Sequence, residues 1–105
     1  MIPDNELVKS ILAGNQESYS YLVNKYKNMV FSVCYRILDN IEEAEDIAQE
    51  VFVKAYFSLN RHKRHESKFS SWLYRIAYTT SISKKREFKF HNWNQQYYYF
   101  WNQRF

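Results

Sequence analysis

The stretch EEAEDIAQEVFVKAYFSL, residues Glu42–Leu59, decides the fold because it places two different surfaces on one helix. Its small and apolar residues recur at steps of three and four, which puts them on one stripe of a helix and predicts that the stripe faces a core. The stripe consists of Ala44, Ile47, Ala48, Val51, Phe52, Ala55 and Leu59. Asn40 is a suitable N-cap, and Glu43 follows at the spacing of a capping box.

The opposite side of the same helix is acidic and amide-bearing, with apolar residues toward its end. It carries Glu42, Asp46, Gln49 and Val53 in one narrow sector, with Glu50 and Phe57 beside it. One interpretation is a solvated acidic face. The other is a docking surface for a basic or mixed partner, because exposed apolar residues ringed by charge often mark interaction sites.

Length and composition limit the architecture to one small helical domain. A chain of 105 residues can build one core, and a single Gly, a single Pro and 46% hydrophobic residues in long periodic runs favour an all-α fold. No apolar run reaches about 18 residues, so no membrane span is expected, and the N-terminus lacks the pattern of a signal peptide. Cys34 is the only cysteine, which suits a cytoplasmic protein without an internal disulfide.

Periodicity predicts a bundle of four helices, over residues 4–13, 15–38, 40–59 and 70–87. We expect Leu12 to face inward with the other apolar residues of the first helix, Gly14 to end that helix and Asn15 to cap the second. The second helix has an inward stripe made of Tyr19, Leu22, Val23, Tyr26, Val30, Val33, Cys34, Ile37 and Leu38. Because Cys34 lies on that stripe, we interpret it as a buried hydrophobe rather than a reactive thiol.

Charge is distributed unequally between the two parts of the chain. Residues 1–59 hold nine acidic and five basic side chains, a net charge of −4, whereas residues 60–105 hold two and ten, a net charge of +8. This asymmetry supports a nucleic-acid partner for the second part. Residues 60–70 show no helical stripe and predict a basic loop, in which His62 and His65 alone are too few for a zinc site.

The last predicted helix ends in Lys84, Lys85 and Arg86, which either complement the negative end of its dipole or bind a phosphate backbone. We divide the chain into a domain of residues 1–87 and a tail of residues 88–105. The tail is rich in aromatic residues and has no acidic residue. The tail has four open interpretations: it packs on the domain, stacks on unpaired bases, mediates self-association, or is the altered end of a truncated chain.

Two motifs resemble region 2 of bacterial sigma factors, and within these the small extracytoplasmic-function group. The first runs from Ala44 to Tyr56 and the second, FSSWLYRIA, from Phe69 to Ala77, within a resemblance that covers about residues 4–86. It implies a sigma-region-2 bundle in which the acidic helix face binds the clamp helices of the beta-prime subunit of core RNA polymerase. For this chain we assign that role to Glu45, Asp46, Gln49, Glu50 and Val53.

The resemblance also implies contact with the non-template strand of melted −10 promoter DNA, through the loop and the final helix. The residues that we assign to this contact are Lys63, Arg64, Lys68, Phe69, Trp72, Arg75, Thr79, Lys84, Lys85 and Arg86. For Phe69 and Trp72 a second interpretation is that they anchor the loop in the core. The resemblance further suggests an anti-sigma factor as an inhibitory partner.

The sequence departs from the family pattern where promoter bases are read. Lys63 and His65 stand where the loop often has an aromatic residue and a glycine, and Thr79 and Ser83 stand where the helix usually has Asn and Asp. We therefore keep a rival function, a sigma-like interaction module or decoy that binds a protein without specific promoter recognition. No phosphate loop, metal set or nucleophile–base pair is visible, so we expect neither an enzyme nor a cofactor.

Overall fold

The computed structural model describes residues 2–62 and 68–104, and the side chains of residues 2–62 and 68–87. In these residues all regular secondary structure is helical, as the sequence predicts. The helices are α1 (Asp4–Leu12), α2 (Ser18–Leu38), α3 (Ile41–Phe57), α4 (Leu59–His62) and α5 (Phe69–Arg104). No described helix is both long and apolar enough to cross a membrane.

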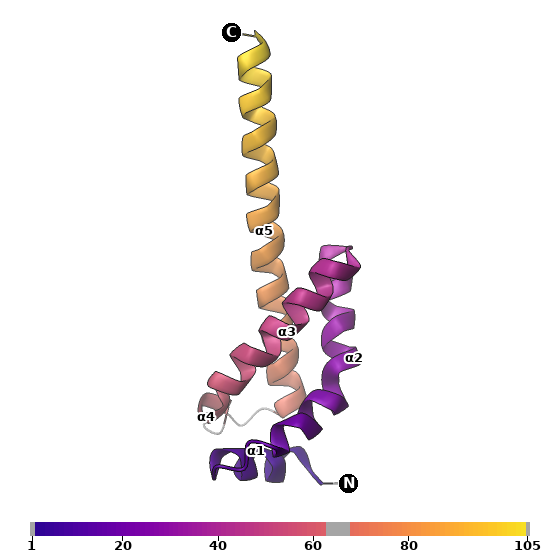
Figure 1. The fold of residues 1–105 in the computed structure, drawn as a ribbon, viewed down its shortest axis with the longest axis vertical. Coiled ribbons are helices and arrows are strands. Elements are labelled where there is room, and N and C mark those ends of the chain that lie inside the picture. The colour runs from indigo at the N-terminus through magenta and orange to yellow at the C-terminus, as the bar shows by residue number, and fades with distance from the viewer. Residues whose placement is uncertain (1, 63–67, 105) are drawn as a thin grey trace.

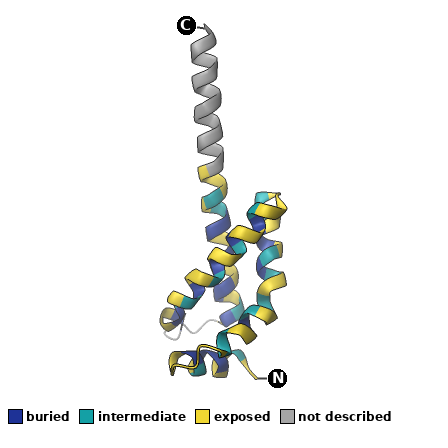
Figure 2. Ribbon diagram, viewed as in Figure 1, coloured by how far each residue is buried: buried dark blue, intermediate teal, exposed yellow. Residues whose placement is uncertain are grey.

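The long helices α2, α3 and α5 pack against one another, and α1 packs across the beginning of α2 (Figure 1). Their inner sides share one core, in which Leu22, Val51 and Leu73 are almost fully buried. Figure 2 shows the resulting division along each helix, with buried residues on the inner side and exposed residues outside. The core therefore fixes which side of α3 and of α5 a partner can reach.

Helix α3 begins as its sequence predicts. Asn40 has an extended backbone, and its side-chain oxygen accepts a hydrogen bond from the Glu43 backbone N–H at 2.9 Å. This bond satisfies one of the N–H groups that have no partner within the helix, and Glu42 and Glu43 add favourable charge at the positive end of the helix dipole. The inward stripe is confirmed at Ala44 and Val51, both 0% exposed.

Two predictions about the first two helices are wrong in detail. Leu12 is 39% exposed, because it lies in the last turn of α1, where only the Leu7, Val8 and Ile11 side contacts the core. Helix α2 begins at Ser18 without a side-chain cap, because the Asn15 and Gln16 carbonyls accept three-residue turn bonds from Ser18 and Tyr19. Gly14 has a positive φ of 109°, the conformation expected of the residue that ends α1.

The prediction of four helices is also wrong, since the structure describes five among residues 2–62 and 68–104. The additional helix, α4, lies at the start of the predicted basic loop. It forms because the Ser58 carbonyl accepts hydrogen bonds from the N–H groups of Arg61 (2.9 Å) and His62 (3.3 Å), and because Leu59 is buried in the core. Leu59 and His62, the first and last residues of α4, are both buried. Their burial stabilises this single turn, although the sequence shows no helical stripe there.

Helix α5 is longer than predicted and continues past Glu87 to Arg104. Figure 1 shows its second half extending beyond the other helices. Residues 69–104 contain neither Gly nor Pro, so no residue in this stretch strongly disfavours a continued helix. As a consequence, Lys84, Lys85 and Arg86 lie inside a helix, and the interpretation that they complement the dipole at its end is wrong.

Cys34 is 0% exposed within the core, as expected for a cysteine on the inner stripe of α2. Burial raises the pKa of its thiol above the ordinary value, because the thiolate would lose its hydration there. The thiol therefore stays protonated at neutral pH, which favours the interpretation of Cys34 as a packing residue.

Candidate functional site

The outer face of α3 carries the residues that the sequence assigns to a protein partner. Glu45, Asp46, Gln49 and Glu50 are all exposed, and Figure 2 shows exposed residues along the outer side of α3. Glu50 also forms an ion pair with Lys54 one turn later, at 3.3 Å, and both side chains are about half exposed. Such an exposed pair is weak, and it involves only one of the three carboxylates among these four residues.

The same face becomes apolar toward the end of α3. Val53 is 55% exposed and Phe57 is 78% exposed, one helical turn further on. The Phe57 ring contacts Tyr56 edge-on, with centroids 5.4 Å apart, and most of the Phe57 side chain remains open to solvent. The outer face of α3 therefore combines carboxylates with exposed apolar surface, a combination typical of docking surfaces.

A groove between α2 and α3 adjoins the acidic residues, and sequence periodicity did not reveal it. It has a volume of about 330 Å³, and is lined by Val23, Lys27, Asn28, Phe31, Glu45, Ala48, Gln49 and Phe52. The sequence predicts Ala48 and Phe52 on the inward stripe, but they are only partly buried, because they pack at the edge of the core and line this groove. The groove extends the partner-accessible surface from α3 onto α2.

The basic residues assigned to nucleic acid divide into three groups. Lys68, Arg75, Lys85 and Arg86 are exposed at the start of α5 and along it. Lys84 is instead partly buried, and lines a small polar cleft between α3 and α5 together with Glu50, Lys54, Thr80, Ser83 and Glu87. Lys63 and Arg64 lie outside the described residues.

Phe69 and Trp72 belong to the core rather than to an exposed surface. They are 4% and 8% exposed, and their ring centroids are 5.8 Å apart. His62 at the end of α4 lies 5.4 Å from the Phe69 ring and 5.0 Å from the Trp72 ring. This placement favours their interpretation as anchors of the segment between α4 and α5, since neither ring presents a free face for a base.

Thr79 is exposed on α5, but its hydroxyl bonds to its own helix. It lies 2.9 Å from the Arg75 carbonyl oxygen and 3.3 Å from that of Ile76, and donates to them. The outer surface of α5 also carries Tyr74 and Tyr78, each nearly half exposed, which stack on each other with centroids 6.5 Å apart. The described part of this helix thus offers cations and aromatic rings rather than amide groups.

No metal site accompanies these surfaces in the part of the chain with described side chains, where no three His, Cys, Asp or Glu residues come close enough to hold an ion. What the fold presents is an all-helical domain with an acidic, partly apolar face on one helix and a basic face on another. That combination is typical of a domain that binds a protein and a nucleic acid.

Comparison with known proteins identifies this class. The Sigma-70 region 2 family matches residues 22–90, and the chain therefore belongs to that family. It is similar to the ECF RNA polymerase sigma factor SigW of Bacillus subtilis, with 42% identity over 82 residues, and to the RNA polymerase sigma-H factor of Pseudomonas aeruginosa, with 38% identity over 78 residues. These matches cover 78% and 74% of this chain, but only 43% and 40% of those proteins.

The structure is also similar to an engineered region 2 of sigmaE, solved by NMR in complex with GTAAAA. The TM-score is 0.70 at 34% sequence identity, and the match covers 79% of this chain and 85% of that one. The fold of this chain is thus that of region 2, whereas the chain spans less than half the length of the curated sigma factors that it matches.

Proposed function

We propose that this chain acts in transcription initiation, as a sigma-type domain that docks on core RNA polymerase and contacts melted −10 promoter DNA. The observation that carries the proposal is the presence of two exposed faces of opposite charge, on α3 and on α5, in the region 2 fold. The polymerase-binding residues are Glu45, Asp46, Gln49, Glu50 and Val53. The DNA-binding residues that remain exposed are Lys68, Arg75, Thr79, Lys85 and Arg86.

Docking on the polymerase would use the outer face of α3, and its partner would be the clamp helices of the beta-prime subunit. Carboxylates on an exposed helix increase the rate and orient the approach of a basic partner more than they add affinity. The exposed side chains of Val53 and Phe57 supply apolar area that a partner can bury. The groove between α2 and α3 offers a further contact next to Glu45 and Gln49.

Binding of DNA would use the start and the outer face of α5. Lys68, Arg75, Lys85 and Arg86 are exposed and would neutralise phosphates, and each such contact would release counterions and make binding salt-dependent. The sigmaE region with the same fold is in complex with GTAAAA, which supports a nucleic-acid ligand for this chain. We include Lys63, Arg64 and Lys84 as further phosphate contacts.

Capture of the protein by purified core RNA polymerase tests the first half of the proposal. The variant Asp46→Lys/Glu50→Lys should lose capture, because it reverses the charge at the centre of the α3 face. The matched control is Glu6→Lys/Glu17→Lys, which makes the same change of charge at exposed positions outside α3 and should leave capture intact. Circular dichroism of all three proteins should be equally helical. Failure of the unmutated protein to bind polymerase would refute the proposal.

Binding of a fluorescent single-stranded GTAAAA oligonucleotide tests the second half. We expect an affinity that falls as salt is raised, since phosphate contacts dominate single-strand binding. Polymerase capture without any binding of the oligonucleotide would favour the rival function, a sigma-like module or decoy that binds a protein partner and does not recognise promoter DNA.

A further inference from the structure

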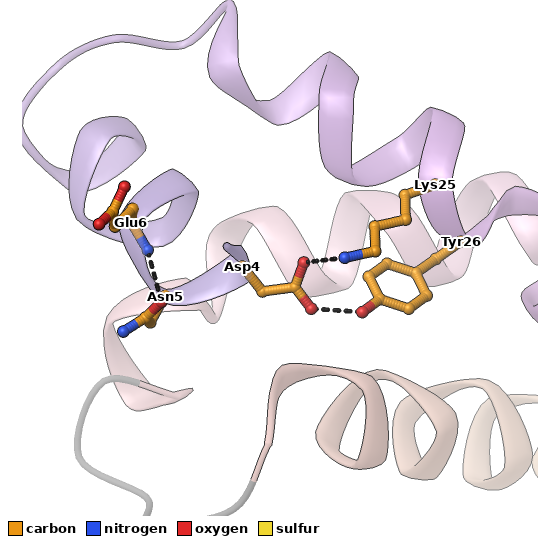
Figure 3. Close-up of polar contacts among 5 residues, drawn as sticks. All are labelled: Asp4, Asn5, Glu6, Lys25 and Tyr26. Carbon is orange, nitrogen blue, oxygen red and sulfur yellow. Dashed lines mark hydrogen bonds and ion pairs between the residues drawn. The ribbon is translucent and has the colours of Figure 1, made fainter. Parts of the chain in front are cut away.

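Helix α1 is tied to α2 by the first residue of α1, Asp4. Its carboxylate accepts a hydrogen bond from Lys25 Nζ at 2.9 Å and a second one from the Tyr26 hydroxyl, so that its two oxygens have different partners (Figure 3). Glu6, two residues later on α1, is exposed and points away from this pair in the same view. One carboxylate of α1 is therefore engaged across the helix interface and the next is not.

The bond to Tyr26 constrains the structure more than the bond to Lys25. An ion pair to a solvated lysine is weak and easily rearranged, whereas Tyr26 is partly buried and has a rigid ring. Burial, and then the hydrogen bond to Asp4, raise the pKa of the Tyr26 phenol above its ordinary value. The phenol therefore remains a protonated donor at neutral pH, and Asp4 fixes the position of the ring.

The Tyr26 ring in turn packs on the aromatic cluster that joins α4 to α5. Its centroid lies 5.7 Å from that of Phe69, the first residue of α5. Phe69 contacts Trp72 one turn later and His62 at the end of α4. The contacts Asp4–Tyr26–Phe69 thus connect α1 with the point where α5 begins, next to the exposed cations Lys68 and Arg75.

We propose that Asp4 is a positioning residue for nucleic-acid binding: by holding Tyr26 against Phe69, it sets the start of α5 and the direction in which Lys68 and Arg75 project. The inference rests on the proposed function of α5. It assigns a role to α1, which lies outside residues 22–90, the part of the chain matched by the Sigma-70 region 2 family. Helix α1 also contacts α4, whose last residue, His62, packs on Phe69.

The test compares Asp4→Ala with Glu6→Ala. Both changes remove one carboxylate from the first turn of α1, so they share any effect on the helix dipole. We expect Asp4→Ala to weaken binding of the single-stranded GTAAAA oligonucleotide about fivefold, and Glu6→Ala to leave it unchanged. Tyr26→Phe, which removes only the hydroxyl, should match Asp4→Ala, and the double variant should be no weaker than either alone.

Two further measurements separate positioning from a loss of folding. Capture by core polymerase should be the same for Asp4→Ala and Glu6→Ala, because the α3 face does not depend on this contact. In NMR spectra, the backbone amide signals of Phe69 and Trp72 should shift in Asp4→Ala, whereas those of Asp46 and Gln49 should not. A parallel loss of oligonucleotide binding and polymerase capture would overturn the inference, since it would show general destabilisation.

Equal oligonucleotide binding by Asp4→Ala and Glu6→Ala would also overturn the inference, but would leave the proposed function intact. Absence of oligonucleotide binding by the unmutated protein would instead refute the DNA-binding half of the proposed function, and the role of Asp4 with it. The unmutated protein is therefore measured first.

Discussion

The outer faces of α3 and α5 differ in chemistry although their inner faces enter the same core. On α3 the exposed residues are carboxylates followed by Val53 and Phe57, whereas on α5 they are the cations Arg75, Lys85 and Arg86 with two stacked tyrosines. Packing explains only the inner faces, because a core requires apolar side chains on the buried side of each helix and does not constrain the side chains that face water. The difference between the outer faces therefore has no cause in the core, and it fits the proposed function, in which α3 contacts a protein and α5 contacts a polyanion.

The largest effect is expected from a change in the core that α3 and α5 share, because both outer faces depend on that core for their position. Leu73 is 0% exposed between the helices, so Leu73→Ala should lower the free energy of unfolding by about 3 kcal/mol, from lost burial and the cavity left behind. Urea denaturation measures this. The neighbouring change Tyr74→Ala, at a residue 49% exposed, should cost less than about 1 kcal/mol. Equal costs for the two changes would contradict the shared core.

The next effect should be confined to the α3 face. Phe57→Ser removes the most exposed of the large apolar side chains described, and should weaken polymerase binding about tenfold by removing apolar area from the interface. Stability should change little. Tyr21→Ser, at a residue 63% exposed on α2, is the control and should leave polymerase binding unchanged. If Phe57→Ser binds normally, the apolar end of α3 is not part of the docking surface.

A smaller effect should be confined to the α5 face. Arg75→Ala should weaken oligonucleotide binding a few-fold and flatten the slope of log affinity against log salt by roughly 0.7 to 1 unit, because one phosphate contact is lost. Titrations of the oligonucleotide at several salt concentrations measure this slope. Lys9→Ala removes an exposed cation from α1 and should not alter the slope. An unchanged slope for Arg75→Ala would remove this residue from the DNA-binding surface.

The smallest effect concerns the interface between α2 and α3, and appears only in alkali. Tyr19 donates a hydrogen bond to the Phe52 carbonyl, and burial followed by the proximity of Tyr56 raises the pKa of Tyr19 above its ordinary value near 10. The unfolded chain thus loses the phenol proton at lower pH than the folded one, so the stabilising contribution is full below about pH 10 and decreases as pH rises further.

Urea midpoints at pH 9, 10 and 11 test this prediction. The midpoint of the unmutated protein should fall more steeply above pH 10 than that of Tyr19→Phe, which has no phenol to titrate. Tyr21→Phe on the exposed side of α2 should behave like the unmutated protein. If Tyr19→Phe shows the same fall, the buried phenol does not link α2 and α3 in the way described.

Much of the fold could be predicted from local patterns. The capping bond from Asn40 to Glu43 and the stripe through Ala44 and Val51 depend on residues three or four apart, and such spacing determines which side chains share a helix face. The exposure of Asp46 and Gln49 follows from the same rule, since they lie opposite the stripe. The exposure of this face was therefore predictable from the sequence, whereas its role as a docking surface stays a prediction.

Other parts could not be predicted, because they depend on contacts between residues distant in the sequence. Phe69 and Trp72 are aromatic residues of the kind that stack on bases. In the structure, however, they are buried in the core, where Phe69 packs on Tyr26 and Trp72 packs on His62. Lys84 is adjacent in sequence to two exposed cations, yet it lies against α3. The predictions for α4 and for the start of α2 were wrong for a related reason. In these short segments, a few backbone hydrogen bonds of turns outweigh the weak local preferences of the residues.

The sequence by itself determined the helical character of the chain, the amphipathic division of α3 and the separation of charge between its two parts, because each depends on residue type and on spacing along one helix. The tertiary structure decided which basic and aromatic residues reach solvent, created the groove between α2 and α3, and joined Asp4 to Phe69 through Tyr26. These features arise where separate helices meet, and their relative placement is fixed only when the common core packs.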